Sequence, residues 1–422
     1  ETEIGFFSYK DILLLKQNKF DQIKINRNDL SSIIYTSGTS GNPKGVVLSH
    51  RSIITNCESA YCLLENLNIE NERFLSFLPL SHSYERMAGL YFPLSIGAEI
   101  FYSESLDKVN LNLIEVKPTL VTAVPRFYEN IFKKINLKFS KSNILLNFLF
   151  KEKLKFISSG SKINSSIKLS FFNFVFNILI SKKISKIFGG NLKTFVSGGA
   201  ALDPKIGNFF LSMGINILQG YGQTEAGPLI SCNTLLNNET KSVGYPVKNV
   251  LVKISSKKEI LVKGPNVMEG YWNNKRLTSK TIINEWLHTG DLGYFDSKKR
   301  IIINGRKKDL IVTSGGDNIS PNKIENLLTI NSIISQALIF GNSKPYIVAL
   351  IVSENKTNLN NIKKIVINVN KQLNTYEVIR KYIIIDEPFT YENGFLTQTL
   401  KIKRDNVFQK YESKIEELYP KL

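Results

Sequence analysis

Tyr35-Thr-Ser-Gly-Thr-Ser-Gly-Asn-Pro-Lys-Gly45 is the most informative stretch of this 422-residue sequence. Its four hydroxyl side chains, three glycines and one lysine offer almost no apolar area for core packing. Small residues instead let backbone N–H groups approach an anion, hydroxyls add hydrogen-bond donors, and a lysine supplies a point charge. The stretch is not a Walker A loop, because Lys44 is followed by Gly45 and the glycine spacing is wrong. We therefore predict a phosphate-binding loop of another kind.

The residues on either side of this loop predict a strand, a second strand and a helix. Ser31–Tyr35 is a short strand-like run, and Val46–Leu48 gives the second strand signal. Ser49 is a suitable N-cap for a helix that begins at His50.

Strand-like and helix-like runs then alternate along the chain. Ala98–Tyr102 and Leu120–Val124 are strand-like, and Asp107–Val116 between them has a helical pattern. Another strand is expected at Thr194–Ser197. This alternation predicts an α/β domain with largely parallel strand pairing.

The last part of the chain has a different character. From about residue 240, short strands and turns indicate a small β subdomain. Gly305–Asp309 is a charged joint that contains glycine, and an α+β segment follows it, closed by the helix-like Val407–Leu418. We therefore predict a first domain over residues 1–304, a hinge over 305–309 and a C-terminal domain over 310–422.

Composition limits the class of protein. With 42% hydrophobic and 11% aromatic residues, the chain is expected to be globular. The net charge of +19 attracts polyanions, although a lysine-rich composition explains it as well, and no basic nucleic-acid motif appears.

Three cysteines without disulfide or metal spacing indicate a reducing, cytoplasmic compartment. The longest apolar stretch, Leu169–Ile180, has 12 residues, fewer than the roughly 20 that a membrane-spanning helix needs.

Four further motifs follow the loop in order. They are Tyr221-Gly-Gln-Thr-Glu225, Thr289-Gly-Asp-Leu-Gly293, Gly305-Arg-Lys-Lys-Asp309 and Leu396-Thr-Gln-Thr-Leu-Lys-Ile-Lys-Arg404. Together with the loop they resemble the signatures of the acyl-adenylate-forming superfamily, which includes acyl-CoA synthetases, luciferases and nonribosomal adenylation domains. The resemblance extends from about residue 30 to the carboxyl end. It implies a large α/β domain of αβαβα-type sheets with a small β subdomain, followed by a small, mobile α+β domain.

The resemblance also implies a site for ATP. By position, Thr36–Lys44 cradles the β- and γ-phosphates, Tyr221 offers a face to adenine, Asp291 takes the ribose hydroxyls, and Arg306 contacts ribose and phosphate. Gly199 and Ala200 leave room beside the ring, and Gln219 and Gly220 edge the same slot. The implied nucleotide-binding residues are Thr36, Ser37, Gly38, Thr39, Ser40, Gly41, Lys44, Gly199, Ala200, Gln219, Gly220, Tyr221, Thr224, Asp291 and Arg306.

The same resemblance assigns the chemistry. Glu225, with Thr36, matches the ligands of Mg²⁺, a hard cation that prefers oxygen. Thr224 matches a residue that contacts the α-phosphate. Lys401 matches the lysine that stabilises the α-phosphoryl transition state; Lys403 is a rival, and Lys401 is preferred because Arg404 follows it at the family's spacing. The implied catalytic residues are Lys401, Thr224, Glu225, His82 and Lys44.

Leu78-Pro-Leu-Ser-His-Ser-Tyr-Glu-Arg86 narrows the resemblance. His82 falls where relatives place a histidine or an aromatic residue that lines the acyl pocket near the carboxylate. The run is typical of long-chain fatty acyl-CoA synthetases, and Lys410–Tyr419 is similar to the same branch. We therefore expect a long-chain fatty acid, ATP and CoA as substrates.

A thiol acceptor must reach the adenylate for the second half-reaction. Lys308 matches the position about which the family's C-terminal domain rotates. Ser314-Gly-Gly-Asp-Asn-Ile-Ser-Pro321 matches the segment that lines the CoA tunnel, in which Ser314, Gly315 and Gly316 are the implied contacts. Missing side chains at the two glycines would admit the slim pantetheine arm of CoA.

Residues 131–187 have no counterpart among these motifs. They contain 12 lysines and one acidic residue, Glu152, beside apolar clusters such as Phe171–Ile180. Long-chain acids partition into bilayers, so this region predicts a peripheral contact with an anionic membrane. The alternative is an ordinary core segment with a solvated lysine face.

The front of the chain departs from the family pattern. Only about 30 residues precede the phosphate-binding loop, fewer than in family members, so a fragment lacking the N-terminal part is expected. Gln398 also stands where the long-chain branch usually has proline. Two alternatives stay open: a relative that passes its acyl-adenylate to another acceptor, and an inactive nucleotide-binding remnant.

Overall fold

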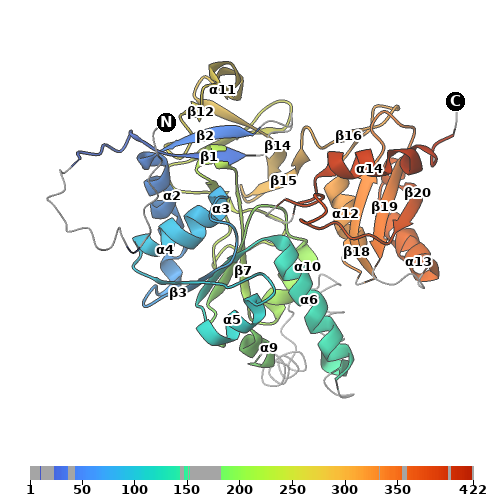
Figure 1. Cartoon of the computed structure of the whole chain (residues 1–422), viewed down its shortest axis with the longest axis horizontal. Helices are drawn as coiled ribbons and strands as arrows, with labels where there is room; N and C mark the ends of the chain where they lie inside the picture. Colours follow the sequence, from blue (N-terminus) through green and yellow to red (C-terminus); the bar gives the residue numbers. More distant parts are fainter. Residues whose placement is uncertain are drawn as a thin grey trace.

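The computed structural model describes most of the chain as two domains, which lie left and right in Figure 1. The described residues are 10, 23–36, 43–142, 147–150, 152, 182–331, 333–353, 359–397 and 401–420. Ser37 to Gly41 of the predicted phosphate loop, Phe171–Ile180 with most of the predicted membrane contact, and Gln398 lie outside them. No helix in the described part of the chain is long and apolar enough to cross a bilayer.

The large domain is built on a seven-stranded sheet with the order β4-β3-β5-β6-β7-β8-β9. The first five of these strands pair in parallel, and β8 and β9 join antiparallel. The predicted α/β class with largely parallel pairing is confirmed. The strands are β3 (Arg73–Ser76), β4 (Glu99–Tyr102), β5 (Leu120–Ala123), β6 (Thr194–Ser197), β7 (Asn216–Gly222), β8 (Leu229–Cys232) and β9 (Tyr245–Pro246).

Helices cover both faces of this sheet (Figure 1). Leu75 and Val121 point into one hydrophobic core, whereas their chain neighbours Phe74 and Leu120 point into another, because successive strand residues face opposite sides. The first core includes α5 (Val109–Val116), α6 (Pro125–Ser140), α9 (Lys182–Ile187) and α10 (Pro204–Ser212). The second includes α2 (His50–Leu63), η2 (Arg86–Tyr91) and α4 (Phe92–Ser95), near α3 (Ser83–Glu85) and η1 (Glu65–Leu67).

Two smaller sheets carry several of the predicted site residues. One has the order β1-β2-β12, and the other contains β10, β11, β14, β13 and β15. Both contribute to one shared hydrophobic core, which holds them against the end of β7. Their elements are β1 (Leu30–Thr36), β2 (Lys44–Ser49), η4 (Thr224–Ala226), β10 (Leu251–Ile254), β11 (Glu259–Lys263), β12 (Gly270–Tyr271), α11 (Lys275–Thr281), β13 (Ile282–Ile283), β14 (Trp286–Phe295) and β15 (Ile301–Arg306).

The predicted strand–loop–strand–helix unit is present, with one difference. β1 and β2 form an antiparallel hairpin that pairs Thr36 with Lys44 at its end, so the predicted phosphate loop connects its two strands. Ser49 occupies the N-cap position of α2 as predicted. Its hydroxyl makes no capping hydrogen bond and is buried without a partner among the described residues, so backbone geometry and packing start this helix.

The C-terminal domain has a three-stranded sheet with helices on both faces. Ile339 and Ile351 face α12 and α13, whereas Leu338 and Leu350 face α14. The domain contains β16 (Ile311–Val312), β17 (Asn318–Ile319), α12 (Pro321–Thr329), β18 (Ile334–Phe340), β19 (Ile347–Ser353), α13 (Leu359–Asn370), η5 (Thr375–Glu377), β20 (Ile379–Ile385) and α14 (Arg404–Glu416). This matches the α+β domain that the sequence predicts; the bounds 1–304, 305–309 and 310–422 stay a prediction.

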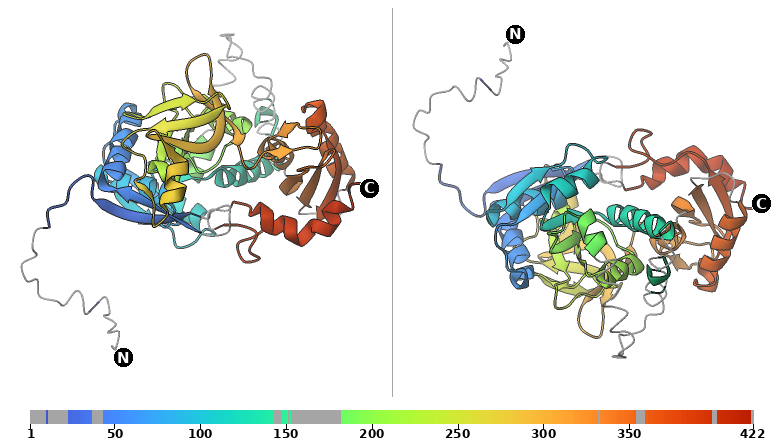
Figure 2. Two further views of the ribbon diagram at one scale, coloured as in Figure 1. Left: turned by 90° about the horizontal axis from the view of Figure 1, so that it is seen from above. Right: turned by 90° about the horizontal axis from the view of Figure 1, so that it is seen from below.

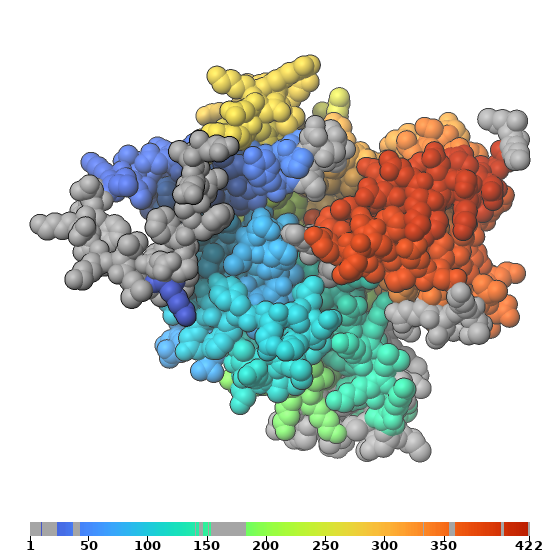
Figure 3. Space-filling view, viewed as in Figure 1, coloured from blue at the N-terminus to red at the C-terminus, as the bar shows by residue number. Residues whose placement is uncertain are grey.

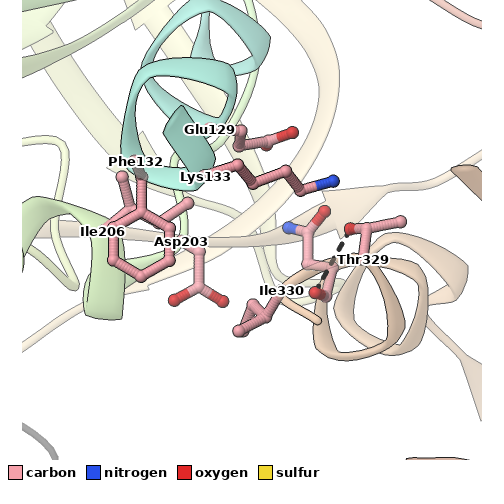
Figure 4. A pocket seen from close by; sticks show the side chains of 8 residues that line it. Glu129, Phe132, Lys133, Asp203, Ile206, Thr329 and Ile330 are labelled. Atoms are coloured by element: carbon pink, nitrogen blue, oxygen red, sulfur yellow. Dashed lines mark hydrogen bonds between the residues drawn. The ribbon is translucent and has the colours of Figure 1, made fainter. Parts of the chain in front are cut away.

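The C-terminal domain lies to one side of the large domain in both views of Figure 2, and Figure 3 shows the two surfaces next to each other. α6 and α10 of the large domain face α12 of the C-terminal domain across a narrow crevice (Figure 4). Lys133 of α6 donates to the carbonyl of Ile334 at 3.4 Å. α12 is therefore one of the elements through which the C-terminal domain contacts the large domain.

Candidate active site

Asp291 lies at the centre of a hydrogen-bonded group with Tyr221 and Arg306, here called the Asp291 cluster. β14 and β15 pair Asp291 with Arg306 across the ladder, and Tyr221 comes from β7. Oδ2 of Asp291 accepts the Tyr221 hydroxyl at 2.8 Å, and Oδ1 accepts Nε of Arg306 at 2.6 Å. Asp291 is only 5% exposed, so these partners compensate a charge that would be costly to bury alone. Burial and the neighbouring Asp291 carboxylate raise the pKa of Tyr221.

The cluster keeps the capacity to bind two hydroxyl groups. Each carboxylate oxygen has two acceptor positions, and the protein occupies one on each oxygen of Asp291. A vicinal diol such as a ribose 2′,3′-diol matches two acceptors fixed in this way. Three sequence motifs far apart in the chain thus meet at one point.

Gln219 shapes the loop beside this cluster and does not present a free amide. Its Oε1 accepts the N–H of Leu202 at 2.8 Å, and its Nε2 donates to the carbonyl of Ser242 at 3.2 Å. Gly199 has φ +81°, a conformation that glycine adopts without strain. Gly199 and Ala200 are both exposed, so the loop leaves open space where the sequence predicts the adenine slot.

Gly220 also lies beside this slot, on β7. An added Cβ there would meet only ordinary contacts, the nearest being Sγ of Cys232 at 3.5 Å. Packing inside the protein therefore does not require glycine at this position. Gly222 differs, because a Cβ there would lie 1.9 Å from the carbonyl oxygen of Pro228.

Glu225, Lys44 and Thr36 approach one another from three elements. The hydroxyl of Tyr271 donates to Oε1 of Glu225 at 2.8 Å, and Nζ of Lys44 lies 5.6 Å from the Tyr271 ring centroid. Thr36 faces Lys44 across the hairpin. The described residues contain no group of three or more His, Cys, Asp or Glu side chains that could hold a metal alone. The Glu225 carboxylate and the Thr36 hydroxyl offer oxygen atoms, the ligand type that Mg²⁺ prefers, and their role as its ligands stays a prediction.

Thr224 meets the segment that contains His82. The hydroxyls of Thr224 and Ser83 are 2.9 Å apart, and both side chains are buried. Nδ1 of His82 accepts the N–H of Tyr84 at 3.2 Å and so caps the short α3. Burial lowers the pKa of His82 to about 4, and the charge of Lys401 contributes. His82 is therefore a neutral imidazole at neutral pH, as a residue near an acyl group would be.

Lys401 reaches this site from the C-terminal domain. It is exposed, but it lies among groups of both domains: desolvation and then the charge of Arg306 lower its pKa, whereas Asp291 and Asp309 oppose the shift. Lys403 is instead the N-cap residue of α14, and its N–H donates to the carbonyl of Phe395 at 2.8 Å. The position of Lys401 near His82 and the Asp291 cluster favours it over Lys403 as the catalytic lysine.

The predicted hinge and CoA residues take two different places. Lys308 follows β15, and desolvation together with Arg306 lowers its pKa, so it lies close to the Asp291 cluster. Ser314, Gly315 and Gly316 are exposed in the turn between β16 and β17. The hydrogen bonds of this turn run within the C-terminal domain, such as Ser314 N–H to the carbonyl of Lys344 at 2.9 Å. In this arrangement of the two domains, the side of the C-terminal domain that carries Lys401 faces the Asp291 cluster.

Comparison with known proteins identifies the family. The family model "AMP-binding enzyme" matches residues 8–272, and "AMP-binding enzyme C-terminal domain" matches residues 308–422. The chain belongs to the AMP-binding enzyme family. It is an adenylate-forming, acyl-activating enzyme by this membership.

Relatives of this AMP-binding enzyme include two ligases of long-chain fatty acids. The long-chain-fatty-acid–CoA ligase FadD15 of Mycobacterium tuberculosis is 31% identical over 94% of this chain and 70% of its own length. The chloroplastic long-chain-fatty-acid–[acyl-carrier-protein] ligase AEE15 of Arabidopsis thaliana is 31% identical over 94% of this chain and 62% of its own length. The chain thus spans about two thirds of the length of these relatives.

Solved structures show the same fold. The O-succinylbenzoate coenzyme A synthetase of Bacillus subtilis, in complex with ATP and magnesium ion, superposes with a TM-score of 0.68 at 21% identity. The match covers 94% of this chain and 74% of that protein. The predicted architecture, a large α/β domain followed by a small C-terminal domain, is confirmed by this likeness.

The structure adds residues that motif reasoning missed in this AMP-binding enzyme. Tyr271 holds Glu225, Ser83 contacts Thr224, and Glu85 is completely buried, with hydrogen bonds from Ser76 at 2.6 Å and Thr122 at 3.2 Å. Ser83 and Glu85 stand inside the histidine-containing run and were within reach of sequence reasoning. Tyr271 belongs to none of the motifs. Its place beside the site becomes visible only from the pairing of β12 with β2.

Proposed function

We propose that this protein is a long-chain fatty acid:CoA ligase of the AMP-forming type. The observation that supports the proposal is the Asp291 cluster of the AMP-binding enzyme fold, close enough to Lys401 of the C-terminal domain for their charges to interact. A cation there would stabilise charge on a carboxylate and an α-phosphate that react beside the cluster. Both reactants are anions, so the site must neutralise charge before they can meet.

The proposed first half-reaction forms acyl-AMP. A carboxylate oxygen of the fatty acid attacks the α-phosphorus, the bond to the β-phosphate oxygen breaks, and pyrophosphate leaves. Lys401 and Thr224 would stabilise charge on the α-phosphoryl oxygens, and Lys44 would stabilise the leaving pyrophosphate. Mg²⁺ held by Glu225 and Thr36 would supply further charge neutralisation on the phosphates. Asp291 would hold the ribose, and Tyr221 would contact the adenine.

The preference for a long acyl chain rests on two features. The run around His82 resembles long-chain synthetases, and FadD15 is described as a long-chain-fatty-acid–CoA ligase.

Two acceptors of the acyl group fit the proposed reaction, CoA and a carrier protein. CoA is proposed because Ser314, Gly315 and Gly316 form an exposed turn without bulky side chains. A carrier protein is the second candidate, since AEE15 is described as an acyl-carrier-protein ligase. In the proposed second half-reaction the thiolate attacks the acyl carbon, AMP leaves, and a thioester remains.

The test of the proposed activity uses ATP–pyrophosphate exchange with acetate, benzoate, octanoate, dodecanoate and hexadecanoate. Exchange should require Mg²⁺ and should be fastest with the two longest acids. Mass spectrometry of the products with CoA or with an acyl carrier protein then identifies the acceptor. Binding of ATP without exchange for any acid would instead support an inactive nucleotide-binding remnant.

A peripheral membrane contact through residues 131–187 stays a proposal. The described part of this region includes Lys134 and Lys138 on α6, beside which Leu137 is 53% exposed. Liposome co-sedimentation tests it: binding should require anionic lipid, weaken with salt, and fall when Lys151, Lys153 and Lys155 become Glu. Equal binding to neutral liposomes would contradict it.

A further inference from the structure

The segment that carries Lys401 is anchored in the C-terminal domain on both sides of this residue. In its described part a β-bridge joins Leu396 to Ile402, the N–H of Thr397 donates to the carbonyl of Lys401 at 2.8 Å, and the N–H of Lys401 donates to Oγ1 of Thr397 at 3.1 Å. Leu396 and Ile402 also pack in the core that contains Leu338, Leu350 and Val407. One more contact, on the C-terminal side of Lys401, bears on the direction of its side chain.

That contact comes from Arg404, three residues after Lys401 and the first residue of α14. Its Nη1 donates to Oε1 of Glu325 at 2.7 Å, and its Nη2 donates to Oε2 at 2.9 Å. This bidentate pair holds the guanidinium plane in one orientation, which a single hydrogen bond would not do.

The pair is further tied to the central sheet of the C-terminal domain. Nη1 of Arg404 also donates to the carbonyl of Ile339 at 3.0 Å, and Oε1 of Glu325 accepts the N–H of Ile339 at 2.8 Å. The Glu325 side chain is 11% exposed and that of Arg404 is 28% exposed. Three elements, α12, β18 and the start of α14, are thus joined at one largely buried point.

α12 also lies at the boundary between the two domains. Its residues Asn326 and Thr329, and Ile330 just after it, line the crevice opposite Phe132 and Ile206 (Figure 4). The helix at this boundary also carries Glu325, which holds Arg404. Any change of the angle between α12 and α14 moves Lys401 relative to the Asp291 cluster.

We propose that Glu325 and Arg404 are positioning residues that fix the direction of Lys401 for the adenylation half-reaction. This inference rests on the proposed function, because it assigns the pair a role in that reaction. A buried ion pair contributes little net stability, since desolvation offsets the attraction, but it selects one geometry among several. A displacement of about 1 Å of a reacting group can cost on the order of a hundredfold in rate.

The experiment compares both half-reactions in three variants. Arg404→Met removes the pair, Arg404→Lys keeps the charge but loses the bidentate contact, and Glu325→Arg with Arg404→Glu exchanges the charges. Adenylation is followed by ATP–pyrophosphate exchange with dodecanoate, and acyl transfer by the reaction of preformed dodecanoyl-AMP with the thiol acceptor. Arg404→Met should lower kcat of adenylation about tenfold or more with little change in the KM for ATP, and acyl transfer should stay within about twofold.

The matched control is another ion pair on the same helix. Lys323 of α12 pairs with Glu377 at 2.7 Å, and in the described part of the chain neither residue has a hydrogen bond or ion pair with residues 396–402. Lys323→Met should leave both half-reactions within about twofold. The exchanged pair should recover part of the adenylation rate, and Arg404→Lys should lie between Arg404→Met and the unchanged protein.

A double substitution separates positioning from general stability. In a Lys401→Ala background, Arg404→Met should cause no further loss of the residual adenylation, because the lysine that it positions is absent. An additional tenfold loss there, or equal losses in both half-reactions, would overturn the inference while leaving the proposed function intact. Absence of exchange in the unchanged protein would overturn the proposed function and this inference together.

Discussion

Asp291 is 5% exposed and has both carboxylate oxygens hydrogen-bonded by residues of the large domain, whereas Lys401 is exposed in a hairpin of the C-terminal domain. The Asp291 cluster is fixed by strand pairing between β14 and β15, so its geometry is set as soon as the large domain folds. The position of Lys401 depends in addition on α12, Arg404 and the placement of one domain on the other. The first region is therefore suited to binding that must persist through both half-reactions. The second is suited to a contact that is made in one domain arrangement and lost in another.

The largest expected effect concerns Lys401. Lys401→Ala should lower adenylate formation by about 10²–10³-fold, roughly 3–4 kcal/mol, because a charge contact made in the transition state is lost. Thioester formation from preformed acyl-AMP should remain. Pyrophosphate exchange and acyl transfer measure the two steps separately, and Lys403→Ala serves as the control. Equal loss in both steps would mean that Lys401 is structural and would remove the contrast between the two regions.

The second prediction concerns His82, where the two regions meet. Its pKa is about 4 in the folded protein against 6.5 ordinarily, so below pH 6.5 the unfolded chain takes up a proton that the folded protein does not. The corresponding stability is present in full above pH 6.5 and is lost as the pH falls toward 4. The free energy of unfolding should drop by about 2–3 kcal/mol over this range.

Urea unfolding between pH 4.5 and pH 7 measures this effect. His82→Phe should show a shallower decrease toward acid pH than the unchanged protein. An unchanged acid dependence in His82→Phe would show that His82 is not held neutral in the folded protein.

The third prediction concerns the fixed region. Glu225→Ala should raise the Mg²⁺ concentration for half-maximal pyrophosphate exchange about tenfold or more, because a charged oxygen ligand is lost. Folding without ATP should change far less. Tyr271→Phe removes only the hydrogen bond to Oε1 and should have a smaller effect. Unchanged magnesium dependence in Glu225→Ala would reject this assignment.

The smallest expected effect is that of Tyr221→Phe. The substitution keeps the ring but removes the hydroxyl that donates to Asp291, a loss of about 1 kcal/mol. The KM for ATP should rise about fivefold, and acyl transfer should be little changed. A drop in kcat with unchanged KM would instead place Tyr221 in the chemical step and would weaken the division between a binding region and a catalytic one.

Sequence reasoning reached the architecture because the relevant signals are local. The strand at Thr194–Ser197 is found with the predicted bounds, and the strands of the β1–β2 hairpin extend the predicted runs by one or two residues. These segments are short, apolar and bounded by turn residues, so neighbouring residues suffice to specify them. Ser49 shows the limit of such local reasoning. Its residue type predicts a hydroxyl that caps α2, but this hydroxyl is buried and makes no capping hydrogen bond.

The family motifs also named most of the residues that the structure brings together, including Asp291, Arg306, Thr224 and Glu225. Their roles in binding and catalysis stay predictions. Tyr271 and Glu325 were missed for a common reason: each acts on a site residue from far away in the sequence. Glu325 lies 79 residues before Arg404, and no local pattern links a carboxylate on one helix to a guanidinium on another.

The sequence by itself determined the α/β class, the two strands that flank the predicted phosphate loop and the family, because these depend on periodicity, turn residues and short motifs. Only the tertiary structure decided which residues hold the functional ones in place. It showed that Gln219 braces a loop, that the surroundings of His82 lower its pKa, and that Arg404, three residues after Lys401, pairs with Glu325 on another helix. Burial and hydrogen-bond partners arise from contacts between distant segments, and those contacts exist only once the sheets and helices have packed.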